Sequence, residues 1–508
     1  MAIQFDNTNT GSATLKPATS GTLNLTLPSA DGTSGQALTT NGSGQLAFST
    51  VGGGGLTGFT AAESTAAPNA TVYVDSLTSS AASTNADVAF VAKGTGATLA
   101  QVPDSTTTGG NKRGANATDW QKSRTAANQV ASGTSSTIAG GENNRAGNIV
   151  SFVGGGGSNS SINTGAAIAG GFSNTASGGY SAIVGGSTNT ASSPYAFVGG
   201  GTTNAANTAT TGYNVVVGGA NNIASGDYSF VGGGGDATTA TDRNTASGVY
   251  AVVTGGKVNT ASSPVSFVGG GSTNTATTAF TGYNTVVGGL SNAAIANYAF
   301  VGGGSSNVAS GQYSAIAGGT SNTASGSSSA IFGGSGNTAN ASGSSVNGGE
   351  NGATRSIVGN AVFPACSQPI SGVSGTSQAA LLILAVQTTN ATATVLRSNT
   401  SAASTTNQVI LPNSSAYYFR GSITAGVTGG GNSAMWSFEG GIKRGANAAA
   451  TTLIQSVINP VAADAGASTW IVALSADTTN GGLAVTVTGQ ASTTIRWVCK
   501  IETTEMTY

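Results

Sequence analysis

Between residues 140 and 349 the chain breaks at a Gly-Gly pair about every fifteen residues, fourteen times in all. In eleven of these breaks an asparagine stands three residues past the last glycine, and an alanine stands two residues further on. Short apolar pairs such as Phe197-Val198 and Phe230-Val231 come directly before the glycines. So regular a repeat predicts one short supersecondary unit stacked many times, in which each unit contacts only its neighbours.

Each unit is predicted as strand, corner, short strand, corner. β-branched and aromatic residues favour pleated backbone, whereas glycine permits positive φ and asparagine tolerates the left-handed region. Parallel stacking places Asn over Asn and Ala over Ala about 4.8 Å apart, so fourteen coils extend about 65 to 70 Å. The repeated asparagines are a predicted structural ladder: Asn174, Asn189, Asn204, Asn222, Asn259, Asn274, Asn292, Asn307, Asn322 and Asn337.

A coil of this size has a very small interior, and one apolar pair plus an alanine buries little surface. We therefore expect several chains side by side, with the alanines allowing close approach. Eight tyrosines also keep phase, and they are interpreted either as an aromatic track for glycans or as packing along the coil edge or between subunits. Packing is favoured because tyrosine suits half-buried positions: Tyr180, Tyr195, Tyr213, Tyr228, Tyr250, Tyr283, Tyr298 and Tyr313.

The repeat is itself duplicated over seventy residues, since 185–230 matches 255–300. Both copies contain a longer coil, ending at Gly218 and at Gly288, and residues 236–243 are an insertion. These segments are expected to leave the stack as loops.

From about residue 356 the glycine repeat stops and longer alternating strands are expected. They predict an antiparallel sandwich or jelly roll of about 150 residues, with Trp436, Trp470 and Trp497 in its core. Alternation in the last strand also predicts a buried free thiol at Cys499. The expected strands are 379–386, 392–396, 408–411, 417–423, 435–443, 451–458, 470–475, 483–488 and 494–501.

The N-terminal part is predicted to hold small β modules. Short strands around the Asp31-Gly32 and Asn41-Gly42 turns are expected in residues 1–55, and further strands near 71–74 and 88–92. The chain thus divides into an N-terminal module (1–55), a small β segment and entry to the repeat (56–131), the repeat (132–355) and a C-terminal domain (356–508).

The composition disfavours several functions. Only 6% of the residues are charged, 80 are glycine and the net charge is −1, without the basic clusters that nucleic-acid binding requires. The N-terminus lacks the pattern of a secretory signal and the longest apolar stretch, 379–386, is too short to span a bilayer. We therefore expect synthesis in a cytoplasm and no membrane insertion.

Catalytic chemistry is also disfavoured. The chain has no histidine, so the commonest general base and metal ligand are missing. Its seventeen carboxylates are scattered, which leaves only a glycosidase-like pair open. Calcium-binding β-rolls need Asp in every turn, and these turns carry Asn, Ser and Thr instead. No catalytic residue, metal site or cofactor is expected.

Four residues of the C-terminal domain are candidate receptor contacts: Tyr417, Arg420, Lys443 and Arg444. The Lys443-Arg444 pair belongs to a Lys-Arg-Gly-Ala-Asn stretch that is interpreted as a solvated loop or as a contact for an anionic surface glycan.

The coil N-x-A-S-G-x-Y-S-x-φ-φ-G-G, as in residues 174–186, resembles the head repeats of YadA-like trimeric adhesins and similar coils in bacteriophage tail fibres. The resemblance implies a left-handed parallel β-roll with three chains around one axis. The chain departs from the adhesin heads in using Gly-Gly where they commonly have a single glycine.

The flanking segments distinguish these two families. Residues 25–48, 111–133 and 470–498 resemble the N-terminal module, the coil entry and the terminal domain of phage fibres. The signal peptide and C-terminal membrane barrel of bacterial adhesins are not recognisable. The resemblance thus implies a homotrimeric phage tail fibre, assembled in the host cytoplasm and located in the virion.

In such a fibre the N-terminus holds a tail or baseplate protein of the virion, and the C-terminus contacts a host cell-surface glycan or protein. Two alternatives remain open. One is another virion fibre, at the neck, head or baseplate, that contacts another virion protein. The other is a polysaccharide-degrading tail spike.

Overall fold

The computed structural model describes residues 89–508 except 209–210 and 279–280. Before residue 89 it describes only 14–15, 23–24, 28–30, 32–33, 36–40, 45–50, 59–64 and 74–79. The chain divides into two compact units, residues 1–91 and 92–508. Within the described ranges the fold is all-β, and its helical turns are two short 3-10 helices, η1 (Ala448–Ala450) and η2 (Ala465–Ala467). None of the described helices is long and apolar enough to cross a membrane.

The described segments of the first unit form three antiparallel strand pairs: β1 (Thr14–Leu15) with β2 (Leu23–Asn24), β3 (Gln36–Thr40) with β4 (Leu46–Thr50), and β5 (Phe59–Ser64) with β6 (Val74–Ser79). The expected Asn41-Gly42 turn falls between β3 and β4, although its own residues lie outside the described ones. The strand expected near 88–92 is wrong, because residues 89–92 have no regular structure.

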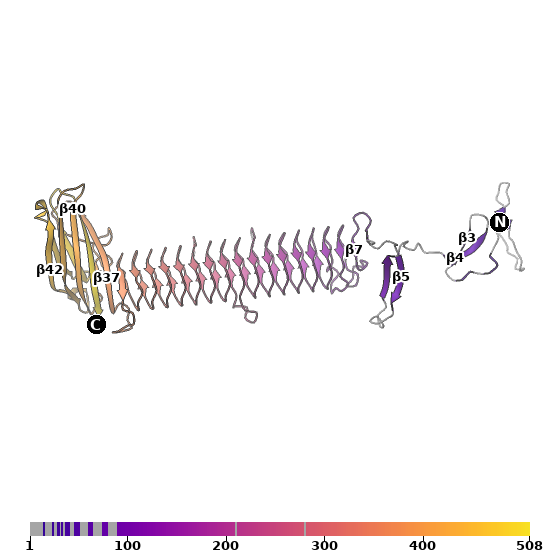
Figure 1. Cartoon of the computed structure of the whole chain (residues 1–508), viewed down its shortest axis with the longest axis horizontal. Coiled ribbons are helices and arrows are strands. Elements are labelled where there is room, and N and C mark those ends of the chain that lie inside the picture. The colour runs from indigo at the N-terminus through magenta and orange to yellow at the C-terminus, as the bar shows by residue number, and fades with distance from the viewer. Residues whose placement is uncertain are drawn as a thin grey trace. The chain divides into compact units, whose positions relative to one another are not determined.

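The second unit begins with a β-solenoid of about 16 turns, residues 118–362, which we call the shaft. It extends beyond the fourteen Gly-Gly breaks at both ends. Each regular turn contributes one two-residue strand to each of two parallel sheets, S1 and S2, which appear in Figure 1 as the row of short arrows between β7 and β37. Parallel stacking of short coils is thus confirmed.

Sheet S1 follows β7 (Thr98–Leu99) and comprises β8 (Thr118–Asp119), β9 (Thr137–Ile138), β11 (Phe152–Val153), β13 (Ala167–Ile168), β15 (Ala182–Ile183), β17 (Phe197–Val198), β19 (Val215–Val216), β21 (Phe230–Val231), β23 (Val252–Val253), β25 (Phe267–Val268), β27 (Thr285–Val286), β29 (Phe300–Val301), β31 (Ala315–Ile316), β33 (Ala330–Ile331), β35 (Ser345–Val346) and β36 (Ala361–Pro364).

Sheet S2 has 13 strands: β10 (Arg145–Ala146), β12 (Ser160–Ser161), β14 (Thr175–Ala176), β16 (Thr190–Ala191), β18 (Ala205–Ala206), β20 (Ile223–Ala224), β22 (Thr245–Ala246), β24 (Thr260–Ala261), β26 (Thr275–Ala276), β28 (Ala293–Ala294), β30 (Val308–Ala309), β32 (Thr323–Ala324) and β34 (Thr338–Ala339).

Alternation along each short strand decides what the shaft buries. In β14 and β15 the first residue faces outward, whereas Ala176 and Ile183 are at most 1% exposed. The same pattern recurs along the shaft and forms one apolar cluster. The expectation that the alanines lie between chains is therefore wrong, because they fill the interior of a single coil.

Glycine is required at the second position of the Gly-Gly corner. Gly186 has a φ of +84°, and a Cβ on it would lie 2.1 Å from the carbonyl oxygen of Gly201 in the next turn. Gly185 has open space around its missing side chain. Successive turns therefore approach so closely that only a residue without a side chain fits at the second glycine.

Residues 235–243 leave the stack as a loop between β21 and β22, as expected (Figure 1). Lys257 Nζ lies 2.7 Å from Asp242 Oδ2 and 3.8 Å from Asp236 Oδ2. All three side chains are partly exposed, so these ion pairs add little stability.

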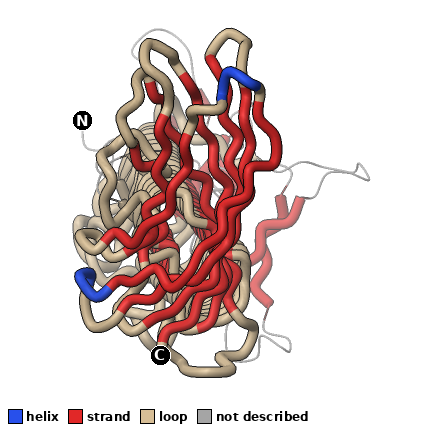
Figure 2. Tube along the Cα trace, turned by 90° about the vertical axis from the view of Figure 1, so that its left-hand side faces the viewer, coloured by secondary structure: helices blue, strands red, loops and turns tan. Residues whose placement is uncertain are grey.

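A C-terminal domain of two antiparallel sheets follows the shaft. The large sheet has the order β36, β37 (Ser377–Thr388), β45 (Ile495–Thr507), β40 (Ser415–Val427), β41 (Ser433–Arg444), β42 (Thr451–Ala463), and Figure 2 shows its strands side by side. In the small sheet, β44 (Gly482–Thr488) pairs with β38 (Thr394–Val395), β39 (Val409–Ile410) and β43 (Ile471–Asp477). A strand lies in each of the nine segments expected from the sequence.

Side chains of both sheets form one apolar cluster. Trp497 is fully buried, and its ring centroid lies 5.7 Å from that of Trp436 and 5.6 Å from that of Trp470. The predicted tryptophan core is therefore present. Cys499 is also fully buried, as predicted, and burial raises the pKa of its thiol to about 12.

Shaft and C-terminal domain are joined through β36, which pairs in parallel with β35 and antiparallel with β37. Beside this joint, Arg355 Nη1 donates to the carboxylate of Glu505 and, at 2.5 Å, to the hydroxyl of Tyr417. Arg355 Nη2 donates to the carbonyl of Gly375. This network ties the end of the shaft to β40 and β45.

Candidate binding face of the C-terminal domain

The outward face of the large sheet carries a row of charged side chains across three neighbouring strands. Arg420 of β40 stands opposite Glu502 of β45 on one side and Glu439 of β41 on the other. Lys500 lies two residues before Glu502 and therefore on the same face. The strand order β45, β40, β41 thus gathers residues that lie far apart in the sequence.

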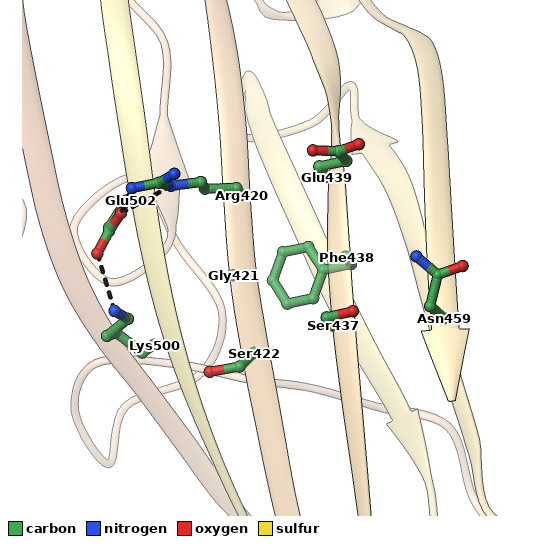
Figure 3. A pocket seen from close by; sticks show the side chains of 9 residues that line it. All are labelled: Arg420, Gly421, Ser422, Ser437, Phe438, Glu439, Asn459, Lys500 and Glu502. Carbon is green, nitrogen blue, oxygen red and sulfur yellow. Dashed lines mark hydrogen bonds and ion pairs between the residues drawn. The ribbon is translucent and has the colours of Figure 1, made fainter. Parts of the chain in front are cut away.

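These side chains pair with one another (Figure 3). Glu502 Oε2 accepts a hydrogen bond from Arg420 Nε at 2.9 Å and forms an ion pair with Arg420 Nη2 at 2.8 Å, and Glu502 Oε1 accepts a hydrogen bond from Lys500 Nζ at 2.8 Å. The bonds from Lys500 and Arg420 lower the pKa of Glu502. Tyr418 donates its hydroxyl to Glu439 Oε2 over 2.9 Å, and this bond raises the pKa of Tyr418.

Two hollows flank the row. The first, of about 410 Å³, is lined by the residues labelled in Figure 3: Arg420, Gly421, Ser422, Ser437, Phe438, Glu439, Asn459, Lys500 and Glu502. The second, of about 550 Å³, lies toward β36 and β37 and is lined by Phe363, Ala379, Ala380, Leu381, Tyr418, Arg420, Glu502, Thr503 and Thr504. Arg420 and Glu502 line both hollows, so we treat the two as one groove.

The groove offers hydrogen-bond donors and acceptors in nearly equal measure. Arg420 and Lys500 are donors, Glu502 and Glu439 are acceptors, and Ser422, Ser437 and Asn459 are both. The cations are balanced by the carboxylates beside them, so the row holds no strong excess of one charge. Such a surface suits a ligand rich in hydroxyl and amide groups better than a highly charged one.

The four predicted contact residues do not form one group. Arg420 lies in the groove. Lys443 is exposed near the end of β41, opposite Ala416. Arg444 is partly buried, and its Nη1 donates to the carbonyls of Leu411 at 2.6 Å and Gly481 at 3.4 Å, so it holds loops together.

The prediction that Tyr417 is a surface contact is wrong, because its side chain is only 2% exposed. Its hydroxyl accepts the bond from Arg355, and desolvation raises its pKa well above the ordinary value. Neighbours in a strand face opposite ways, so the exposed tyrosine here is Tyr418. Glu502, Lys500 and Glu439 were missed because strand order alone places them beside Arg420.

The predicted asparagines lie in the shaft interior and form a continuous hydrogen-bonded ladder. Each Oδ1 accepts the backbone N–H of the next asparagine, as from Asn204 to Asn189 at 2.9 Å. Asn159 and Asn244 belong to it as well. Asn159 was missed in the sequence analysis because the run of four glycines before it places it two residues, not three, past the last glycine. Asn244 was missed because the loop insertion separates this residue from its glycines, although the sequence Asn-Thr-Ala-Ser-Gly carries the repeat signature.

Residues other than asparagine close the ladder at both ends. Gln121 Oε1 accepts the N–H of Asn144, and Asn337 Oδ1 accepts the N–H of Gly352. The asparagines of the ladder therefore have hydrogen-bond partners from its first rung to its last.

The eight tyrosines form an exposed column along one edge of the shaft. Each has a positive φ between 55° and 60°, and each side chain is 42 to 59% exposed. Neighbouring rings stack with centroids 4.7 to 5.5 Å apart and interplanar angles of 6 to 13°. Inside each run both ring faces are covered by other tyrosines, which leaves only edges and hydroxyls for contact.

The described part of the chain contains no group of three or more His, Cys, Asp or Glu side chains placed to hold a metal ion. No protein-family model matches the sequence, and a search of curated proteins finds no significant match either.

Proposed function

We propose that the protein is a non-enzymatic, homotrimeric tail fibre of a bacteriophage, in which the shaft is a stiff spacer and the C-terminal groove binds the host surface. The observation that carries this proposal is the exposed, ion-paired groove on the sheet that continues from the end of the shaft. A solenoid whose asparagine ladder links each turn to the next by hydrogen bonds suits a spacer.

The remaining features of the proposed fibre follow the sequence resemblance. The two C-terminal sheets, with one apolar cluster between them, form a sandwich at the distal tip. The shaft is a left-handed β-roll with three copies around one axis. Residues 1–55 attach the fibre to a tail or baseplate protein of the virion.

We propose that the groove binds a surface glycan without cleaving it. A glycosidase needs one carboxylic acid with a raised pKa to protonate the leaving oxygen. Glu502 is held by two cations, which lower its pKa instead. The paired ions and the hydroxyls of Ser422 and Ser437 are suited to the many hydroxyl groups of a sugar.

Competition with phage adsorption tests this function. Purified full-length protein is expected to block adsorption of the phage to host cells, and the Arg420→Ala, Glu502→Ala double variant is expected to lose this ability at least tenfold. The matched control is Lys443→Ala, an exposed cation on the same sheet outside the groove, which should compete like the unaltered protein. Equal competition by the groove variant contradicts binding by the groove.

Two further measurements separate the alternatives. Labelling the C-terminus on intact virions shows whether it points toward a cell or contacts another virion protein. Release of reducing ends from host polysaccharide by the purified protein would identify a degrading spike and contradict the non-enzymatic proposal.

A further inference from the structure

The outward face of sheet S1 is apolar along the shaft. Between β11 and β33, ten of the twelve turns present a phenylalanine or valine there, whereas the turns of β13 and β31 present only alanines. In five turns a phenylalanine begins the strand and a glycine follows two residues later, as in Phe267 and Gly269. In others a smaller residue begins the strand and a larger one follows it, as in Thr285 with Val287 and Ala330 with Phe332.

In the phenylalanine turns the ring lies beside the glycine. A Cβ added at Gly269 would lie 2.2 Å from the carbonyl oxygen of Val287 and 3.2 Å from the ring of Phe267, and the ring contact measures 3.4 Å at Gly302 with Phe300. The ring therefore lies back over the glycine and fills the second outward position. In these turns a single ring thus covers both outward positions.

Much of this strip is open to solvent. Val184, Val217 and Val287 are 48 to 53% exposed, and Phe332 is 63% exposed. From β9 to β35 no outward residue of S1 in these two positions is charged. Exposed apolar patches of such extent mark interaction surfaces.

The outward face of S2 is different. Seven of its thirteen strands begin with threonine, and the second outward position is most often serine, as in Thr190 with Ser192 and Thr260 with Ser262. The two faces belong to the same turns and have the same backbone geometry. The difference between their side chains therefore reflects a difference in what each face contacts. The polar outward face of S2 suits contact with water, and the apolar outward face of S1 suits contact with another apolar surface.

We propose that the outward face of S1, over residues 152–332, packs against the same face of the other two copies of this chain around a shared axis, with the shafts parallel and in register. The proposal rests on the proposed homotrimer and names the surface that holds it together. Each turn lies level with the same turn of the other copies, and the tyrosine column and the S2 face remain toward solvent.

Three properties of the strip favour a second copy as its occupant. It repeats with the rise of a single turn, about 4.8 Å, and another identical stack offers the same spacing over the same length. It has no charge, so a parallel copy meets no repulsion. The strip has twelve turns and is about 10 Å wide, so it covers roughly 580 Å² per copy, about three quarters of the ~800 Å² per partner of stable interfaces.

Sedimentation of the full-length protein tests the interface. Val217→Lys with Val287→Lys places two charges on the strip, and we expect the oligomer to dissociate to single chains. Thr190→Lys with Thr260→Lys places the same charges on the outward face of S2, where the mass should not change. If the valine variant keeps the mass of the unaltered protein, the S1 interface is wrong; if the unaltered protein is itself a single chain, the homotrimer fails as well.

Crosslinking covers the case in which the charged variant does not fold. In a Cys366→Ser background, Val217→Cys is a mild change, and oxidation with copper phenanthroline should convert most chains to covalent dimers through that position. Thr190→Cys should yield few. Equal or preferential crosslinking at Thr190→Cys, in an oligomer of normal mass, overturns the assignment of S1 while leaving the homotrimer intact.

Discussion

The backbone N–H of Asn189 donates to the side-chain Oδ1 of Asn174, one turn earlier in the shaft, over 2.9 Å. The Nδ2 group of Asn189 donates to the carbonyl of Gly185 in its own turn and to that of Gly201 in the next, both at 2.9 Å. One residue thus connects three successive turns, the preceding turn through its backbone N–H and the next through its side chain. This is why a small buried interior tolerates a polar column: every amide in it is hydrogen-bonded.

Removing one rung should destabilise the shaft. Asn259→Leu leaves the N–H of Asn274 and the carbonyls of Gly255 and Gly271 without their side-chain partner. We expect a cost of about 1 to 3 kcal/mol for each group that stays buried and unpaired. Urea unfolding measures the effect, and Asn207→Ala, at an exposed position, is the control that should change little.

The two glycines of one corner should differ in how well they tolerate the same substitution. Gly186→Ala forces alanine into positive φ and places its Cβ against the carbonyl of Gly201, so we expect a loss well above the ~1 kcal/mol of backbone strain alone. Gly185→Ala meets open space and should be tolerated. Thermal unfolding of both variants decides the matter, and equal stability would contradict the close approach of the turns.

A gap in the tyrosine column offers a stabilising substitution. Val265 stands between Tyr250 and Tyr283 with a φ of 55°, an unfavourable conformation for a β-branched residue, and is 42% exposed. Val265→Tyr should relieve this strain and join the two stacks, adding about 0.5 to 1.5 kcal/mol per ring pair. A higher melting temperature is expected, and Val265→Ala separates the relief of strain from the gain in stacking.

Two glutamates of β45 test what burial does to an ion pair. Glu505→Gln leaves the Arg355 guanidinium buried without its counter-charge, which should cost about 3 to 5 kcal/mol. Glu502→Gln weakens an exposed pair and should cost about 0 to 1 kcal/mol. Urea unfolding followed by tryptophan fluorescence reports on the C-terminal domain, and a similar cost for both would contradict the joint described at Arg355.

The two cysteines should differ in reactivity. Cys366 is exposed and Cys499 is buried, so a thiol reagent at pH 8 should modify one thiol in the native protein and two after denaturation. The folded pKa of Cys499, about 12, lies above its ordinary value of 9.0. The contribution of this thiol to stability is therefore complete below pH 9 and is lost as the pH rises toward 12. The Cys499→Ser variant lacks this thiol, so its free energy of unfolding should fall less between pH 9 and pH 12.

The parts that could be predicted from the sequence are those that depend on near neighbours in the chain. The spacing of glycines, with asparagine and alanine in phase, determined the parallel coils, because each turn pairs with the turns directly before and after it. Alternation determined the nine C-terminal strands and the burial of Trp497 and Cys499 for the same local reason.

Only the tertiary structure decided how distant segments meet. The order β45, β40, β41 places Glu502, Arg420 and Glu439 in one row, and no local pattern encodes that order. It also turned Tyr417 inward to Arg355 and the repeat's alanines into the coil, since in a strand a shift of one residue exchanges inside for outside. Periodicity thus determined which elements form, and packing between distant elements decided which of their faces remain free to bind.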